Sequence, residues 1–341
     1  MQPVPMASAE VHTIADIADI AGVSKSTVSR ALNDSPLISA ETKERIREIA
    51  REHNFQMNDP ARRLSLRQSH VAALVTYAYK ADSAVPDAFM LEIMSGVSAG
   101  LHASGYDLLV IQISPKDTAW VGRYLESGRV DGFVLMAASC SRQHIDALAE
   151  RKAPFIIWGL PPGKHAFCTV SGDSFAGGRT ATEHLLARGR SRIAFLGGYA
   201  SEIEVKDRYR GYEAALREAG KAVDPALVAY GDFTGTGAAA AIRTLLERAG
   251  DLDAVFVNSD LMAIAAMDEL RTQGRRVPDD VAIVGYDDIS IARHSDPPLT
   301  TIRQNGPLAG RLLAENLVEH LQTGAVTNVS IPAELVIRKS A

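Results

Sequence analysis

The chain has 341 residues, of which 46% are apolar and 23% are charged, and its formal net charge is −5. These fractions are typical of a folded globular protein with two or three domains, and they exclude disordered, collagen-like and disulfide-scaffold proteins. The negative net charge by itself gives no sign of a nucleic-acid partner.

Three short helices are predicted in the first seventy residues. Thr13 and Asp16 have the spacing of a capping box, and the apolar residues after them recur at helical intervals. A glycine then interrupts the pattern, and Ser24 caps a second helix over Lys25–Leu32. Ser39 caps a third helix. Its predicted apolar face contains Ile46, Ile49, Ala50 and His53.

The second of these helices separates its side chains into two faces. The inward face contains Val28, Ala31 and Leu32. The outward face carries Lys25, Ser26, Ser29 and Arg30. Two helices joined by a glycine turn, the second with outward hydroxyl and basic groups, are typical of a helix-turn-helix that reads the major groove. A small helical bundle with a solvated face has the same spacing and stays open as an alternative.

The segment after the third helix is short and basic. Asn58 can act as an N-cap and Pro60 suits the first helical position, but one turn is too short to be stable alone in water. Arg62 and Arg63 precede the apolar Leu64. A segment that folds on docking, with an apolar wedge and flanking arginines, suits the DNA minor groove.

From residue 70 onward, short β-type runs alternate with amphipathic helical stretches. The predicted strands are 70–77, 107–113, 132–137, 155–158, 168–170, 192–196, 227–230, 254–257, 281–284, 300–303 and 333–338. The predicted helices include 88–104, 176–188, 210–219, 238–248 and 261–273. This alternation predicts α/β architecture, with two doubly wound parallel-sheet lobes. Pro297-Pro298 and the strand-like 300–303 indicate that the chain crosses back between the lobes.

Residues 13–33 resemble, without gaps, the DNA-binding headpiece of the LacI/GalR family of bacterial repressors, most clearly in AGVSKSTVSRALN at 21–33. The resemblance implies that Lys25, Ser26 and Arg30 read bases, with Thr27 and Ser29 beside them on the same helix. It implies phosphate-side contacts from Thr13 and Asn33. It also implies that the segment 58–69 is a hinge helix and linker, and that Leu64 of this segment opens a base step of the DNA. Its DNA contacts are expected at Asn58, Ala61, Arg62 and Leu64.

The rest of the chain, to about residue 338, is similar to the effector core of the same family, which shares its fold with periplasmic sugar-binding proteins. The likeness lies at 187–194, 208–212, 259–263, 277–281, 285–288 and 298–304. The resemblance implies an all-α headpiece at 1–57, the hinge at 58–69, and a two-lobed effector-binding and dimerisation core at 70–341.

Polar side chains follow several predicted strands, where ligands of open α/β sheets bind. Asp260 and Asp287 come directly after such runs, Arg208 supplies five donors, and Phe233 can stack on a sugar ring. Purely structural roles stay open for these residues. Either aspartate can cap a helix, Arg208 can pair with Glu204 or Asp207, and Phe233 can pack in the core.

By motif position, the resemblance assigns effector contacts to this group. The residues are Arg208, Phe233, Asp287 and Gln304, with Ser259 and Asp260 nearby, and Tyr79, Phe89 and Asp173 as candidates in the first lobe or at the edge of the cleft. The family often has Asn-Asp where this chain has Ser259-Asp260, which leaves the source of one amide contact open.

Enzyme motifs are weak in this sequence. Gly235-Thr236-Gly237 begins a G-x-G-x-x-A match, but it starts several residues after a predicted strand. Gly172-Asp173-Ser174 is similar to an esterase nucleophile block, but no Asp-x-x-His follows it. A phosphate-binding Walker A motif and metal-type clusters of His, Cys and carboxylates are absent from the sequence. We therefore expect no enzyme activity, no cofactor and no metal.

Cys140 and Cys168 suit a reducing compartment, and the first residues lack the pattern of a signal peptide. Together with the resemblance, this predicts a cytoplasmic homodimeric repressor that binds operator DNA, responds to a sugar or sugar derivative, and does not bind membranes. Its expected targets are genes of carbohydrate uptake or catabolism. The alternatives are a purine-responsive or other corepressor-type regulator, and a sugar-binding protein without a regulatory role.

Overall fold

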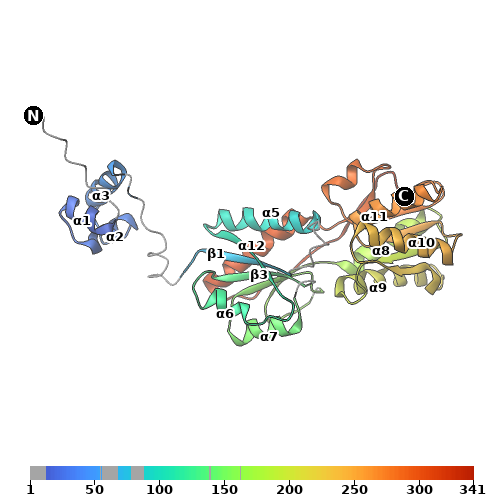
Figure 1. The fold of residues 1–341 in the computed structure, drawn as a ribbon, viewed down its shortest axis with the longest axis horizontal. Coiled ribbons are helices and arrows are strands. Elements are labelled where there is room, and N and C mark those ends of the chain that lie inside the picture. The colour runs from blue at the N-terminus through green and yellow to red at the C-terminus, as the bar shows by residue number, and fades with distance from the viewer. Residues whose placement is uncertain (1–12, 54, 56–67, 78–87, 138–139, 162) are drawn as a thin grey trace, which may run out of the picture. The chain divides into compact units, whose positions relative to one another are not determined.

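The computed structural model describes residues 13–53, 55, 68–77, 88–137, 140–161 and 163–341. These residues belong to two compact units, Met1–Ser69 and His70–Ala341, and each unit is described by itself (Figure 1). The predicted hinge contacts at 58–64 and the candidate Tyr79 lie outside the described residues.

The first unit contains three helices, α1 (Ile14–Ala21), α2 (Lys25–Leu32) and α3 (Ala40–Glu52). Their caps are those that the sequence predicts: a capping box between Thr13 and Asp16, and serine caps at the other two helices. The shared core is small and apolar. It consists of Ile17, Ala18, Ala21, Val28, Ala31, Ile46 and Ala50.

One residue of the predicted apolar face of α3 is placed differently. His53 is exposed, because α3 ends at Glu52 and His53 is its C-cap. The buried face of the helix therefore ends at Ala50.

The second unit contains two six-stranded sheets, which define a first and a second lobe. The strands of the first sheet are β1 (Val71–Tyr77), β2 (Asp107–Ile113), β3 (Gly132–Met136), β4 (Phe155–Trp158), β5 (Cys168–Gly172) and β11 (Asn328–Ile331). Helices α5 (Ala88–Ala103) and α12 (Gly306–Thr323) cover one face of this sheet, and α6 (Trp120–Leu125) and α7 (Arg142–Glu150) cover the other (Figure 1).

The second lobe repeats this plan. Its strands are β6 (Ile193–Gly197), β7 (Val228–Tyr230), β8 (Ala254–Val257), β9 (Ala282–Asp287), β10 (Thr300–Arg303) and β12 (Glu334–Val336). Its helices are α8 (Ser174–Ala187) and α9 (Ile203–Glu218) on one face, and α10 (Gly235–Arg248) and α11 (Asp260–Thr272) on the other. Short 3-10 turns occur at Pro225–Leu227 and Ser290–His294.

The strand orders β2-β1-β3-β4-β5-β11 and β7-β6-β8-β9-β10-β12 correspond one to one. The pairs are parallel except β10 with β12, which are antiparallel. The predicted class is confirmed: an all-α headpiece, followed in the chain by two doubly wound parallel-sheet lobes. Sequence reasoning had not predicted α6, α7, α12 or β11.

The chain passes between the lobes at three places. It leaves the first lobe after β5, returns after β10 to form α12, and crosses again between β11 and β12. The Pro297-Pro298 pair is not itself a crossing, because it lies between β9 and β10 of the same sheet. The chain does cross between the lobes near this pair, as expected, but it does so after the strand 300–303 and not at the prolines.

Glycines set the closest helix contacts in both lobes. A Cβ atom on Gly178 of α8 would lie 2.2 Å from the carbonyl oxygen of Arg208, and one on Gly211 of α9 would lie 2.2 Å from that of Phe175. In the first lobe, a Cβ on Gly96 of α5 would lie 2.3 Å from the carbonyl oxygen of Pro307. These helix pairs approach backbone to backbone, which side chains at these positions would prevent.

Gly211→Ala should therefore lower the free energy of unfolding by about 1–3 kcal/mol, because the new methyl group would overlap with the α8 backbone. Urea denaturation measures this change. Gly235→Ala is the matched control, since its Cβ would meet that of Ala265 at an ordinary 3.4 Å. Equal stability of the two variants would contradict the close contact between α8 and α9.

Candidate functional site

The exposed face of α2 presents the side chains that the sequence assigns to base reading. Lys25, Ser26 and Arg30 are exposed, whereas Val28 and Ala31 are fully buried. The helix has two basic residues and no acidic one, so this face is positive although the whole chain is not. A short helix with such a face suits contact with base edges and phosphates.

The other headpiece candidates also have local structural roles. The Ser24 hydroxyl accepts from the Thr27 amide at 3.1 Å and lies 2.8 Å from the Thr27 hydroxyl. Asn33 donates its side-chain amide to the carbonyl of Ser29 at 2.8 Å, and Thr13 caps α1. Ser29 and Thr27 are half-buried. DNA contacts from these residues stay predictions.

In the second unit, Arg208 forms the centre of a buried polar group. It lies in α9 (Ile203–Glu218), whereas the sequence predicts a helix over 210–219 only and so leaves Arg208 in the loop before it. The residue is 4% exposed, its Nη1 donates to the carbonyl of Asn258 at 2.7 Å, and its guanidinium lies 3.7 Å from the ring centroid of Tyr286. Arg208 does not pair with Asp207, whose carboxylate bonds to Arg210 at 2.9 Å.

The Arg208 guanidinium stays protonated although it is buried. Burial alone lowers the pKa of its guanidinium, but the interactions with Tyr286, Asp287 and Glu204 outweigh burial, so that the pKa lies above its ordinary value. A buried, fixed cation of this kind is a ready donor for an oxygen-rich ligand.

Asp287 and Gln304 form a second part of this group. Asp287 is the last residue of β9, and its Oδ1 accepts from Nε2 of Gln304 at 2.7 Å. Both residues are buried. Asp287 has a φ of 112°, which is strained for a residue with a side chain and is typical of functional positions. Across from Gln304 lies Gly172 of the first lobe, where a Cβ would lie 2.8 Å from Oε1 of Gln304.

Three aspartate and serine candidates form hydrogen bonds within the second unit. Asp173 caps α8 by accepting from Ala176 N at 2.9 Å, and Ser259 caps α11 by accepting from Met262 N at 3.3 Å. Asp260 is fully buried, with Oδ2 accepting from Ile289 N at 2.9 Å and Oδ1 accepting from the Thr301 hydroxyl. Effector contacts from these three residues stay predictions.

The two aromatic candidates differ in their surroundings. The ring of Phe233 covers Gly198 and lies edge-on to Tyr199, with centroids 6.1 Å apart, and Phe233 has a φ of 61°. Phe89 is buried in the first-lobe core, 5.9 Å from the ring of Trp158. Half-buried Phe233 at the ends of β6 and β7 is therefore better placed to stack on a ligand than Phe89.

Two buried residues of this group were missed by sequence reasoning. Tyr286 supports Arg208, and Asn258 accepts from it through its backbone carbonyl. Burial raises the pKa of Tyr286 to about 12, so its hydroxyl stays protonated. The signal for both was their position at the end of a predicted strand, beside Ser259 and Asp287.

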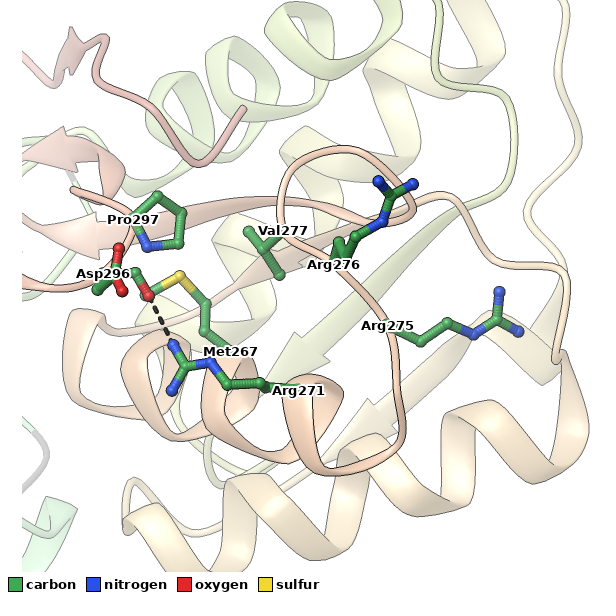
Figure 2. A pocket seen from close by; sticks show the side chains of 7 residues that line it. All are labelled: Met267, Arg271, Arg275, Arg276, Val277, Asp296 and Pro297. Atoms are coloured by element: carbon green, nitrogen blue, oxygen red, sulfur yellow. Dashed lines mark hydrogen bonds between the residues drawn. The ribbon is translucent and has the colours of Figure 1, made fainter.

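A separate cavity of about 210 Å³ lies between α11 and the segments that follow it (Figure 2). It is lined by Arg271, Arg275 and Arg276, whose guanidinium groups do not converge. Arg271 donates to the backbone carbonyl of Asp296 at 2.8 Å and pairs with Asp268. Arg276 is paired with two aspartates. The cavity shares no residue with the group around Arg208.

The glycine-rich motif at 235–237 has a structural explanation. Gly235 begins α10, and the Asp232 carboxylate accepts from the amide and hydroxyl of Thr234, the N-cap of that helix. A Cβ on Gly237 would lie 2.0 Å from the same carboxylate. The position that a phosphate would take at this helix is thus occupied by Asp232.

Within the ranges that the structure describes, no three His, Cys, Asp or Glu side chains are grouped as metal ligands would be. No helix of these ranges is both long enough and apolar enough to cross a membrane.

Comparison with known proteins supports both units. The family described as "Bacterial regulatory proteins, lacI family" matches residues 13–58, and "Periplasmic binding protein-like domain" matches residues 182–341. The HTH-type transcriptional regulator CelR of Thermobifida fusca is 37% identical over 96% of this chain and 98% of its own length. The repressor PurR of Pasteurella multocida is 32% identical over 96% of this chain and 98% of its own.

Solved structures agree with these relatives. A CelR–cellobiose complex is 35% identical with a TM-score of 0.74, covering 96% of this chain and 99% of that one. The lac repressor dimer bound to operator and the anti-inducer ONPF has a TM-score of 0.83 at 27% identity, covering 96% and 98%.

A helix-turn-helix unit joined to a periplasmic-binding-like core defines a DNA-binding transcriptional regulator. The chain belongs to the lacI family of bacterial regulatory proteins.

Arg30→Ala should reduce discrimination between operator and unrelated DNA by about 1–3 kcal/mol, because we predict that the exposed guanidinium of Arg30 on α2 pairs with base edges. Fluorescence anisotropy with a duplex selected in vitro measures both affinities. Arg51→Ala, an exposed arginine of α3 paired with Glu44, is the control. Unchanged discrimination by the Arg30 variant would show that α2 does not read bases.

The buried Asp260 carboxylate predicts a pH dependence of stability. Burial raises its pKa from 3.8 to about 7. Between these values the folded state holds a proton that the unfolded state has lost, so the contribution of Asp260 to the free energy of unfolding falls as pH rises and is constant above about 7. The difference in unfolding free energy between wild type and Asp260→Asn, measured by urea denaturation, should show this slope. A flat difference from pH 4 to 7 would exclude it.

Proposed function

We propose that this protein is a homodimeric transcriptional repressor whose operator affinity is controlled by a sugar bound at the Arg208 group. The observation that carries the proposal is that one chain combines the exposed basic face of α2 with a buried, strained polar group at the ends of β8 and β9. The relatives add that a lac repressor dimer binds operator and that CelR binds cellobiose.

The chemistry of the group suits a neutral polyhydroxyl ligand. Arg208 donates, the Asp287 carboxylate accepts, and Gln304 does both, so the two charges of the set cancel. Sugar hydroxyls need donors and acceptors at once, and Phe233 offers an apolar ring face. Genes of carbohydrate uptake or catabolism are the targets we assign to it.

Ligand binding would bias the angle between the lobes and, through the segment 58–69, the pairing of the two headpieces on a pseudo-palindromic operator. The protein then acts in the cytoplasm, where operator DNA is, and we assign it no catalytic role. A second candidate is a purine-type corepressor, favoured by the 32% identity to PurR over nearly the whole chain.

The test measures operator affinity with and without ligand. Cellobiose is the first probe, followed by other mono- and disaccharides and free purine bases. A true effector should change operator affinity by about 1–3 kcal/mol, and operator should change effector affinity by the same factor. Asp287→Asn should weaken sugar binding at least roughly tenfold by removing the buried charge, while operator affinity without sugar stays unchanged.

Asp268→Asn, an exposed carboxylate paired with Arg271, is the control and should bind as wild type does. Binding of purine bases alone would favour the corepressor alternative. Sugar binding with identical affinity in the presence and absence of operator would overturn the regulatory part of the proposal.

A further inference from the structure

Two neighbouring residues at the end of β9 have left-handed backbone conformations. Asp287 has a φ of 112° and Asp288 has a φ of 58°. Residues with a side chain adopt such conformations at a cost in free energy, and the conformations persist only where the surrounding structure fixes them. Asp287 belongs to the proposed effector site, so whatever fixes this turn also sets the direction in which the Asp287 carboxylate points.

The Asp288 side chain is held by two arginines from different parts of the chain. It is 4% exposed, its Oδ2 accepts from Nε of Arg303 at 2.8 Å, and its Oδ1 accepts from Nη2 of Arg338 at 2.5 Å. Arg303 is the last residue of β10, whereas Arg338 follows β12. Because both oxygens of one buried carboxylate are bound by charged donors, the side chain is fixed, and with it the backbone of the turn.

Arg338 is the more firmly fixed of the two arginines. Its side chain is 14% exposed, compared with 41% for Arg303. Its Nη1 also donates to the Leu299 carbonyl at 2.7 Å. Arg303, in contrast, is shared with the exposed carboxylate of Glu334, at 3.6 Å. Arg338 therefore connects Asp288 to the residue that precedes β10.

The turn is joined directly to the polar group of the site. In the register of β9 with β10, Asp287 lies opposite Arg303, and the Gln304 backbone amide donates to the Asp287 carbonyl at 3.3 Å. The Gln304 side chain donates to Oδ1 of Asp287 at 2.7 Å. A change in the backbone at Asp288 would therefore move the Asp287 carboxylate relative to Gln304.

We infer that Arg338 is a positioning residue of the effector site, which acts through Asp288. Its guanidinium keeps the turn at 287–288 in the left-handed conformation, and the turn directs the Asp287 carboxylate toward the ligand. The contacts of the guanidinium itself are to Asp288 and Leu299. This inference rests on the proposed function, because it concerns the sugar that Asp287 is proposed to bind. Without Arg338 the turn relaxes, and only the molecules that still hold it bind with full affinity.

Arg338→Gln in the full-length protein tests the inference. The probe is cellobiose or, if wild type does not bind it, the sugar of the panel that wild type does bind. Calorimetry well below the unfolding midpoint of each variant should show a loss of affinity of about tenfold, as expected if about a tenth of the folded molecules retain the turn.

This loss should depend on Asp287. The double variant that combines Arg338→Gln with Asp287→Asn should therefore bind the probe at most about twofold more weakly than Asp287→Asn alone, whereas losses from two independent contacts would multiply. A merely structural role of Arg338 would not produce this dependence.

Arg338→Lys is the conservative variant. Lysine keeps a charged donor beside Asp288, so its affinity for the probe should lie between those of wild type and Arg338→Gln. A lysine variant as weak as the glutamine variant would show that the ion pair with Asp288 is not the cause of the loss, and would overturn the inference. If Arg338→Gln does not fold, Arg338→Lys takes its place in the double variant.

Arg192→Gln is the matched control. Arg192 is an arginine of the same lobe that is likewise held by two carboxylates, of Asp224 at 3.1 Å and Asp251 at 3.0 Å, so its removal should leave affinity for the probe unchanged. If Arg338→Gln binds the probe as wild type does, or if its loss multiplies with that of Asp287→Asn, the inference fails while the proposed function stands. If wild type binds no sugar of the panel, the proposed function fails and the inference fails with it.

Discussion

The approach of α8 to α9 through Gly178 and Gly211 is the constraint on which the buried polar group around Arg208 depends. Because the two backbones touch, Arg208 of α9 enters the second lobe at a depth that side chains at these glycines would not permit. At that depth its guanidinium reaches the ring of Tyr286 and the carbonyl of Asn258. The cation is thus fixed before any ligand arrives, as preorganised binding requires.

In the first lobe, α5 and α12 approach each other closely in the same way, at Gly96 and Gly310. One segment of the second lobe also contacts the first. Ile289 lies in the apolar cluster of the first lobe, although its amide is bound by Asp260 of α11. The next amide, of Ser290, donates to Glu92 of α5 at 3.1 Å. The segment after Asp287 is therefore tied to both lobes, at the second and third residues after Asp287.

Local signals allowed much of the fold to be predicted from the sequence. The caps of α1, α2 and α3 are short-range hydrogen bonds, so Thr13, Ser24 and Ser39 mark them directly. Buried strands such as β4 and β8 are recognisable as apolar runs. The polar edge strand β11 lacks this signal, because its residues alternate between exposed and partly buried positions. Helix α12, whose buried face includes glycine and asparagine, also lacks it.

The sequence predicted which residues of the polar group lie together better than it predicted what each of them does there. Arg208, Asp287 and Gln304 come together as expected, since they follow strands or face their ends. Both carboxylate oxygens of Asp260 accept hydrogen bonds within the protein, from Thr301 and Ile289. These partners are distant in sequence, so no local pattern predicts this structural role. The role of Asn258 could not be predicted for the same reason. An asparagine after an apolar strand indicates no role until its partners, or their absence among the described residues, are known.

The three passages of the chain between the lobes have a consequence for how the protein is made. Neither sheet is built from a continuous stretch of sequence, since β11 completes the first sheet only after all but one strand of the second. The headpiece, in contrast, is continuous and emerges from the ribosome before the core. During synthesis it is therefore ready to fold while the core waits for its last two strands, so a DNA-binding unit exists before the unit that controls it.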